Sequence, residues 1–202
     1  MSDKGNILSY FSHPIFQYKL ENHKEHNRDL AKYIYQLYDE DKDGVQKTNI
    51  SGWHSKSFIF SDKKNAPSIF FNAIQGFVVD VFKNYGWLYD TNKVVCSSMW
   101  SIINKKNSFN IEHTHPNNYL SAAYYVKAPD NCGRFSITNP HMISRDKIPK
   151  RTDRTEFNRN AAQIEVKEGD LLIFPSYLPH SVEQNKSDED RIVISFNIDI
   201  IK

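Results

Sequence analysis

The chain has 202 residues, which is enough for one domain with its own hydrophobic core. Its 26 Lys and Arg residues against 24 Asp and Glu residues leave a net charge of +2, so the overall charge does not favour nucleic acid or an acidic membrane surface as a partner. Aromatic residues make up 13% of the chain and glycine is scarce, with seven residues. We therefore expect a well-packed, strand-rich protein rather than a disordered one.

The N-terminus lacks the basic and apolar segments of a signal peptide, and no apolar run approaches the roughly 18 residues of a membrane span. Without signs of export, Cys96 and Cys132 are expected to be reduced thiols. The sequence thus predicts a cytoplasmic protein with no membrane partner, and it is compatible with a homodimer.

The N-terminal part predicts an extended arm and two helices. Residues 7–20 favour an edge strand interrupted by a proline, and His13 in this stretch is expected to be structural or exposed. Residues 22–38 carry the apolar spacing of an amphipathic helix, and residues 67–85 carry a broader apolar stripe that predicts a helix packed against a sheet. Residues 51–60 suggest a strand or an irregular arm, in which His54 beside Trp53 could line a cleft, although a packed or surface position is favoured.

The sequence DEDKDG at residues 39–44 begins like a calcium-binding EF-hand loop. Its three Asp residues and its Gly occupy loop positions 1, 3, 5 and 6, but position 12, which needs a bidentate Glu, is Ile50. We interpret the segment as a polar turn.

From Val94 onward the sequence predicts short strands separated by Pro, Asn and Asp. We expect strands at 94–104, 119–127, 133–138, 162–166, 170–175, 179–183 and 191–200. Strands that follow two helices predict a β-sandwich or barrel with helical buttresses. One connection, residues 139–161, is long and carries a net charge of +3. It is either a solvated insert or a lid that favours an anionic substrate.

Two histidines in this β region form half of a metal site. His113 and His115 are one residue apart, so in an extended chain they point to the same side. His180, on a later strand, offers a third imidazole, and neutral imidazole is a good ligand for Fe(II), Zn(II) and related ions. Three ligands on one face of six-coordinate Fe(II) leave three positions for a bidentate acid and dioxygen.

The usual iron site of this kind has two histidines and one carboxylate, and here His115 stands at the carboxylate position. Glu112 is not an easy substitute because, in an extended segment, it faces away from His113. The third ligand is therefore either His115, which leaves the metal its full +2 charge, or a residue brought in from elsewhere in the fold.

An arginine follows the third histidine and opens an apolar run, RIVISFNI. Arg191 shares a face of this strand with Ser195, and a buried cation needs a partner. A dicarboxylate that chelates the metal through a keto-acid end would supply the partner with its other end, through bidentate hydrogen bonds. The alternative is a structural salt bridge with Asp170, Asp188 or Asp190.

With these residues identified, the chain resembles the 2-oxoglutarate/Fe(II)-dependent oxygenase superfamily, and within it a 2OG-Fe(II) oxygenase family of bacteria and phages. The most specific matching stretches are EHTHPNNYLSAAYYV, GDLLIFPSYLPHSVEQN and DRIVISFN; HPIFQYKL, SGWHS and MWSIIN extend the resemblance over most of the chain. Tyr124-Tyr125-Val126 and the spacing from Arg191 to Ser195 are similar to prolyl hydroxylases.

This resemblance implies a mainly β fold, a double-stranded β-helix (jelly roll) with two or more N-terminal buttressing helices. It implies one domain over residues 1–202, with the arm and helices in 1–92 and the β-core in 93–202. It implies that His113 and His180 are metal ligands, that His115 occupies the carboxylate position, and that Arg191 with Tyr125 holds 2-oxoglutarate. Ser195 and Asn104 are further candidates for the pocket wall. The implied cofactors are Fe(II), the co-substrate 2-oxoglutarate and O2.

The implied activity is hydroxylation of a small-molecule or peptidyl substrate, with release of succinate and CO2. The alternative is a cupin-like protein that binds a metal through three histidines without 2-oxoglutarate, because HxH followed by G-x5-P-x4-H is also a cupin pattern. Such a protein could be another dioxygenase, an isomerase or a binding module. A metal-free structural jelly roll is the third alternative.

Overall fold

Two antiparallel β-sheets face each other in a computed structural model that describes residues 6–58, 64–90, 93–141, 146 and 148–201. The larger sheet has the strand order β1 (Phe16–Lys19), β9 (Asp170–Pro175), β6 (Leu120–Lys127), β11 (Arg191–Ile200), β4 (Val94–Asn104) and β3 (Trp53–His54). The smaller sheet has the order β2 (Asn49–Ile50), β5 (Phe109–His113), β10 (His180–Val182), β7 (Phe135–Thr138) and β8 (Ala161–Ile164). The expected jelly-roll architecture is confirmed.

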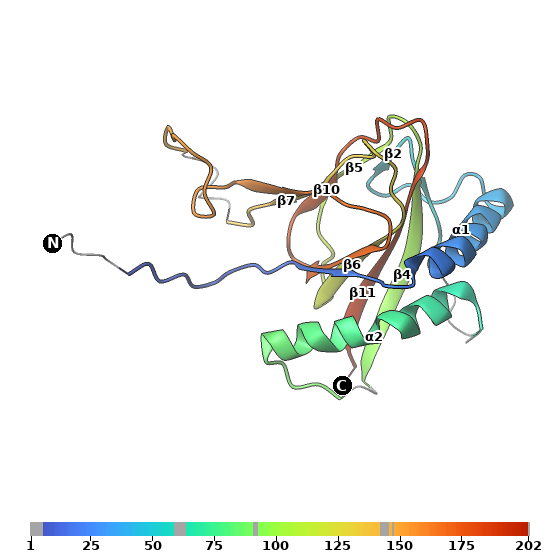
Figure 1. Cartoon of the computed structure of the whole chain (residues 1–202), viewed down its shortest axis with the longest axis horizontal. Helices are drawn as coiled ribbons and strands as arrows, with labels where there is room; N and C mark the ends of the chain where they lie inside the picture. Colours follow the sequence, from blue (N-terminus) through green and yellow to red (C-terminus); the bar gives the residue numbers. More distant parts are fainter. Residues whose placement is uncertain (1–5, 59–63, 91–92, 142–145, 147, 202) are drawn as a thin grey trace.

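Two helices, α1 (His23–Glu40) and α2 (Ala66–Tyr85), lie against the larger sheet (Figure 1). The side chain of Asn65 caps α2 by accepting a hydrogen bond from the backbone N–H of Ser68 at 2.9 Å. The helix ends at Gly86, whose φ of 64° is left-handed and suits glycine. Both helices begin and end within two residues of the predicted bounds.

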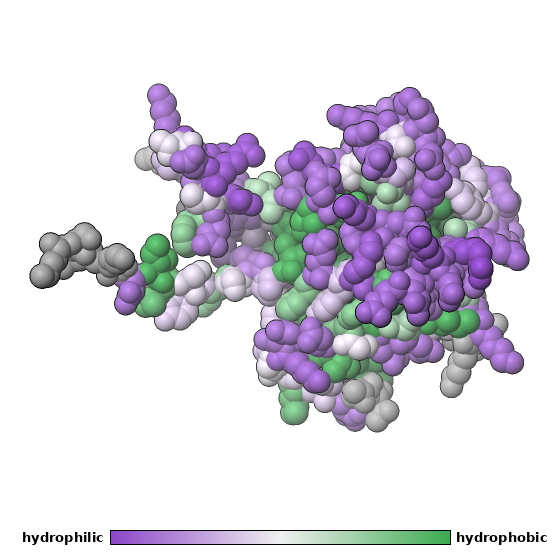
Figure 2. Space-filling model, in the orientation of Figure 1, coloured by the Kyte–Doolittle hydropathy of each residue, from purple (hydrophilic) through white to green (hydrophobic). Residues whose placement is uncertain are grey.

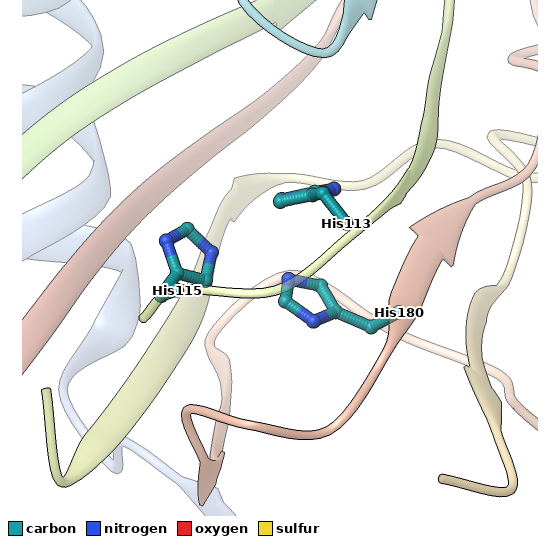
Figure 3. Close-up of side chains that lie close together, drawn as sticks. All are labelled: His113, His115 and His180. Atoms are coloured by element: carbon teal, nitrogen blue, oxygen red, sulfur yellow. The ribbon is translucent and has the colours of Figure 1, made fainter. Parts of the chain in front are cut away.

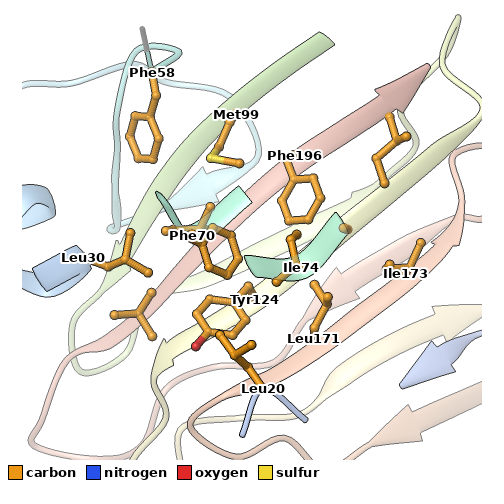
Figure 4. Close-up of a cluster of buried hydrophobic side chains, with 14 of the residues drawn as sticks. Leu20, Leu30, Phe58, Phe70, Ile74, Met99, Tyr124, Leu171, Ile173 and Phe196 are labelled. Carbon is orange, nitrogen blue, oxygen red and sulfur yellow. The ribbon is translucent and has the colours of Figure 1, made fainter. Parts of the chain in front are cut away.

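A hydrophobic core fills the space between these helices and the outer face of the larger sheet (Figure 4). Phe70 of α2 packs against Tyr124 of β6, with ring centroids 4.4 Å apart, and both side chains are fully buried. Ile194 and Phe196 of β11 belong to the same core. Because side chains alternate along a strand, the residues between them face the other way, towards the smaller sheet.

The inner face of the larger sheet therefore carries a second set of side chains in rows across the strands. The first row, at the start of β11, pairs Arg191 with Asn104. The next row pairs Val193 with Ile102 and with Tyr125. Directly opposed residues in antiparallel strands share a face, so the strand register alone aligns these side chains in the space between the two sheets.

In the third row along β11, Ser195 is paired with Trp100 of β4 on one side and with Ala123 of β6 on the other. A second hydrophobic cluster, which includes Phe135 of β7 and Phe174 of β9, fills much of the space between the sheets. The inner side chains of both sheets thus surround one end of the sandwich, and the candidate site lies there.

The structure adds strands that the sequence did not predict. β5 was missed although its sequence, FNIEH, alternates apolar and polar side chains, because a pattern of five residues is a weak signal. It is held by pairing with β10 on one side and β2 on the other, which are contacts between segments distant in sequence. The expected edge strand at residues 7–20 is reduced to β1, and the arm from residue 6 to residue 15 has no regular structure.

This arm projects from the core beside the β7–β8 connection (Figure 1). It exposes four large apolar side chains, Ile7, Leu8, Tyr10 and Phe11, which are 72–90% accessible. They form a hydrophobic patch on a surface that is otherwise mostly hydrophilic in this view (Figure 2). Within the described ranges, no helix has the length and apolar character needed to cross a lipid bilayer.

Candidate metal centre

Three histidines converge at one end of the sandwich (Figure 3). His113 ends β5 and lies directly opposite His180, the first residue of β10, so the register of this strand pair places both side chains on one face. His115 follows β5, and its backbone N–H donates to the carbonyl of Ser176 at 2.9 Å, which anchors the segment to the turn after β9. One nitrogen of each ring lies within 4.8 Å of the others.

Two of the three rings are oriented by backbone carbonyls. Nδ1 of His113 lies 2.8 Å from the carbonyl of Ile111, and Nδ1 of His180 lies 2.8 Å from the carbonyl of Leu178. A carbonyl only accepts, so each Nδ1 carries the proton and each Nε2 keeps its lone pair. An imidazole in this state is ready to bind a metal through Nε2.

The ring of His115 has no hydrogen-bond partner among the described residues. It contacts the other two histidines, with centroid distances of 5.0 Å to His113 and 5.1 Å to His180, and it also contacts the indole ring of Trp100 at 5.5 Å. Ring packing, rather than a hydrogen bond, therefore sets its orientation.

The three imidazoles are neutral at physiological pH. Burial lowers the pKa of His180 to about 3 and, helped by the neighbouring His113 and His54, that of His115 to about 4. Burial also lowers the pKa of His113. Three neutral nitrogen donors held close together suit Fe(II), Ni(II) or Zn(II).

Among the described residues, no carboxylate joins the three histidines. Glu112 instead accepts a hydrogen bond from the hydroxyl of Thr138 at the molecular surface, so it faces away from His113, as predicted. The ligand set that the structure offers is three neutral imidazoles.

The histidines line a cavity of about 350 Å³. Apolar side chains from both sheets form much of its wall: Trp100, Ile102, Ala122, Ala123, Phe135 and Phe174. Ser195, predicted as a pocket residue, lies in the wall as well. None of the described residues of the long connection at 139–161 lines the cavity, so of its two predicted roles the lid receives no support from this part of the chain.

A fourth histidine, His54, lines the same cavity; the sequence offered this role but favoured a packed or surface position. The ring of His54 stacks on Trp100 with an interplanar angle of 9° and a centroid distance of 5.8 Å. Its Nδ1 lies 2.7 Å from the carbonyl of Ser55, which leaves Nε2 unprotonated. The signal that could have found it is the SGWHS stretch, one of the segments that carry the family resemblance.

Arg191, the first residue of β11, is only 1% exposed, and neither it nor the other predicted pocket residues Tyr125 and Asn104 line the cavity. Its Nη1 donates to the backbone carbonyls of Cys132 and Glu183, but Nε and Nη2 have no partner among the described residues. The aspartates considered for a salt bridge are engaged elsewhere: Asp170 with Lys19, Asp188 with Lys106 and Asp190 with Tyr35. Within the described part of the chain, the guanidinium is thus a buried cation without a carboxylate partner.

Other buried polar atoms near this arginine also lack partners. The hydroxyl of Tyr125, in the adjacent row, has no hydrogen bond within the described part of the chain, and burial strongly raises its pKa, so it keeps its proton. Asn104, opposite Arg191, donates to the side chain of Asn110 at 2.9 Å, while its own carbonyl oxygen is unpaired. Unpaired buried donors are costly, and a carboxylate between Arg191 and Tyr125 would satisfy them. These residues therefore fit an organic acid.

The comparisons with known proteins agree with this chemistry. Residues 98–197 match a family model described as "Putative 2OG-Fe(II) oxygenase", and they include the three histidines, Tyr125 and Arg191. The chain belongs to the 2OG-Fe(II) oxygenase family. No curated protein sequence is significantly similar to it.

Solved 2OG-dependent oxygenases share the fold of this family member. A Pseudomonas putida prolyl-4-hydroxylase superposes with a TM-score of 0.66 at 12% identity, covering 95% of each chain. A viral collagen prolyl hydroxylase from Paramecium Bursaria Chlorella virus-1, in its 2OG complex, gives 0.61 at 11% identity, covering 93% of this chain and 96% of its own. HygX from Streptomyces hygroscopicus, with nickel and 2-oxoglutarate bound, gives 0.63 at 12% identity, covering 92% and 82%.

Proposed function

We propose that this 2OG-Fe(II) oxygenase hydroxylates a small molecule or a peptidyl side chain in the cytoplasm. The observation that carries the proposal is the buried guanidinium of Arg191, which has no acid partner among the described residues, in a fold that also holds a cluster of three imidazoles. When bound, Fe(II) with 2-oxoglutarate and O2 supplies the oxidising power, and the co-substrate leaves as succinate and CO2.

The histidines hold the metal. His113 and His180 offer Nε2 because a backbone carbonyl fixes the proton of each ring on Nδ1. His115 completes the face with a third neutral nitrogen and is held in place by the indole ring of Trp100. No proton has to leave these rings before the metal binds at neutral pH, because burial has already lowered their pKa values.

Arg191 and Tyr125 hold the far end of the co-substrate. The free Nε and Nη2 of the guanidinium can donate two parallel hydrogen bonds to a carboxylate, and the Tyr125 hydroxyl can donate a third. The cation is fixed from behind by the carbonyls of Cys132 and Glu183, so it does not reorganise when the acid arrives. Ser195, which lines the cavity, and Asn104, which lies opposite Arg191, are proposed as further wall residues.

The apolar wall of the cavity restricts water around the reacting atoms. Trp100, Phe135 and Phe174 leave few groups that could hydrogen-bond to solvent. The His54 ring presents an acceptor nitrogen into the same cavity, where it can bind an O–H or N–H group of the substrate. Two of the solved structures with this fold are prolyl hydroxylases, which supports a peptidyl substrate as one of the two classes.

The test is an anaerobic titration of the apoprotein with Fe(II) and then 2-oxoglutarate, followed by visible absorption. We expect a charge-transfer band in the native protein. Arg191→Ala should bind Fe(II) without forming the band, because the acid loses its anchor. Arg134→Ala is the matched control, since this arginine is half exposed and paired with Glu183. An unchanged band in Arg191→Ala would refute the assignment.

The three-imidazole ligand set favours a second candidate, a cupin-like metal protein that does not use 2-oxoglutarate. In that case iron would bind to the native protein and 2-oxoglutarate would produce no band. The same titration therefore separates the two functions.

A further inference from the structure

Two histidines outside the candidate metal centre face each other across the molecular surface. His13 belongs to the N-terminal arm, and His141 belongs to the connection between β7 and β8, 128 residues later. Their Nε2 atoms are 3.2 Å apart, and their ring centroids are 5.2 Å apart with an interplanar angle of 48°. The contact joins two segments that otherwise project separately from the core (Figure 1).

This spacing matches two ligands of one metal ion. A tetrahedral ion with bonds of about 2.0–2.1 Å to two imidazole nitrogens places those nitrogens about 3.3 Å apart. Without a cation, one Nε2 must carry a proton for the pair to form a hydrogen bond. A cation between them would satisfy both lone pairs at once.

The other nitrogen of His13 already has a suitable partner. Nδ1 of His13 lies 3.0 Å from the hydroxyl of Tyr177, and the two rings make an edge contact. Metal-binding histidines usually donate their second ring N–H to an oxygen acceptor, which fixes the tautomer and directs the free lone pair at the metal, and the Tyr177 oxygen can accept here. Pro14 also restricts the backbone of His13 to extended conformations and so helps to fix the position of the ring.

We propose that His13 and His141 form a second metal site, for a borderline divalent cation such as Zn²⁺, Ni²⁺ or Cu²⁺, with water in the remaining positions. The ion clips the arm to the β7–β8 connection. Tyr177 lies in the turn between β9 and β10, and the carbonyl of Leu178 in this turn orients His180. The clip therefore ends beside the turn that positions a ligand of the candidate metal centre, although it does not depend on the function of that centre.

The experiment counts metal ions on the tag-free full chain by equilibrium dialysis against Ni²⁺, followed by elemental analysis. The native protein should bind two equivalents, and the double variant His13→Ala/His141→Ala should bind one. The double variant His113→Ala/His180→Ala should also bind one. Because it lacks the candidate metal centre, it measures binding at His13 and His141 alone. His26→Ala, on the accessible surface of α1, is the matched control and should leave the count unchanged.

Two further measurements bear on the clip. Tyr177→Phe should weaken the second equivalent about tenfold, because the partner of Nδ1 is lost. Chymotrypsin cleavage after the exposed Tyr10 or Phe11 should slow when Ni²⁺ is added, and it should not slow in His13→Ala/His141→Ala. A native count that His13→Ala/His141→Ala does not lower, or cleavage that Ni²⁺ does not slow, would overturn the proposal.

Discussion

The orientation of His115 depends on ring packing, in which Trp100 is the contact outside the three-histidine cluster, whereas His113 and His180 each have a carbonyl partner. We predict that Trp100→Leu lowers the affinity for Ni²⁺ about tenfold, a loss typical of removing the support of a metal ligand. His54→Ala should change the affinity by no more than about twofold, because His54 stacks on the same indole without supporting a ligand. Isothermal titration of the folded variants measures both, and equal losses would contradict this role of Trp100.

The two thiols should react slowly. Burial raises the pKa of Cys96 to about 12 and also raises that of Cys132. A raised pKa keeps the thiol protonated, so the reactive thiolate is scarce at pH 8 and increases only at much higher pH. We predict that iodoacetamide modifies Cys96 at least about a hundredfold more slowly in the native protein than in urea, as measured by peptide mapping at pH 8. Equal rates in the two states would show that the thiol is exposed.

Two glycines, one in the loop before β7 and one in α2, should respond oppositely to alanine. Gly133 has a φ of 87°, and a Cβ there would lie 2.5 Å from the carbonyl oxygen of Glu183, which also accepts from Arg191. Gly133→Ala should destabilise the protein by about 1–3 kcal/mol or more. Gly76 lies in α2 with open space around it, so Gly76→Ala should stabilise it by about 0.5–1 kcal/mol. Urea unfolding measures both changes, and a stabilising Gly133→Ala would disprove the argument.

Elements with strong local signals could be predicted from the sequence. The bounds of β4, β9 and β11 agree with the predicted strands because each is rich in apolar and β-branched residues and is bounded by polar or turn residues. β2 and β5 could not be predicted, since they are short and depend on partners elsewhere in the chain.

The sequence predicted the histidines of the candidate site, but not the surroundings of the other residues. The one-residue spacing of His113 and His115 indicated a shared face, and the structure brings His180 to it. The unpaired N–H donors of Arg191 could not be predicted from the sequence. Three aspartates were candidates for a salt bridge with it, and each of them has another partner in the structure. The place of His54 in the cavity depends on its stacking with Trp100, a residue of a different strand.

For the whole molecule, the unpaired guanidinium should cost stability until a ligand arrives. We predict that Arg191→Met makes the apoprotein more stable by about 1 kcal/mol, because an apolar side chain replaces a buried cation without a carboxylate partner. The native protein with Ni²⁺ should gain about 2.7 kcal/mol from 2-oxoglutarate at a hundred times its dissociation constant, whereas Arg191→Met should gain nothing. Chemical unfolding with and without the acid measures both, and a gain in the variant would contradict the assignment.

The outermost strands of both sheets are short. In the larger sheet β1 has four residues and β3 has two, and in the smaller sheet β2 has two and β8 has four. Short edges offer few unpaired backbone groups to another chain, so the molecule is protected against edge-to-edge aggregation. If two copies associate into a homodimer, they should therefore meet through side chains rather than by joining their sheets into a continuous one.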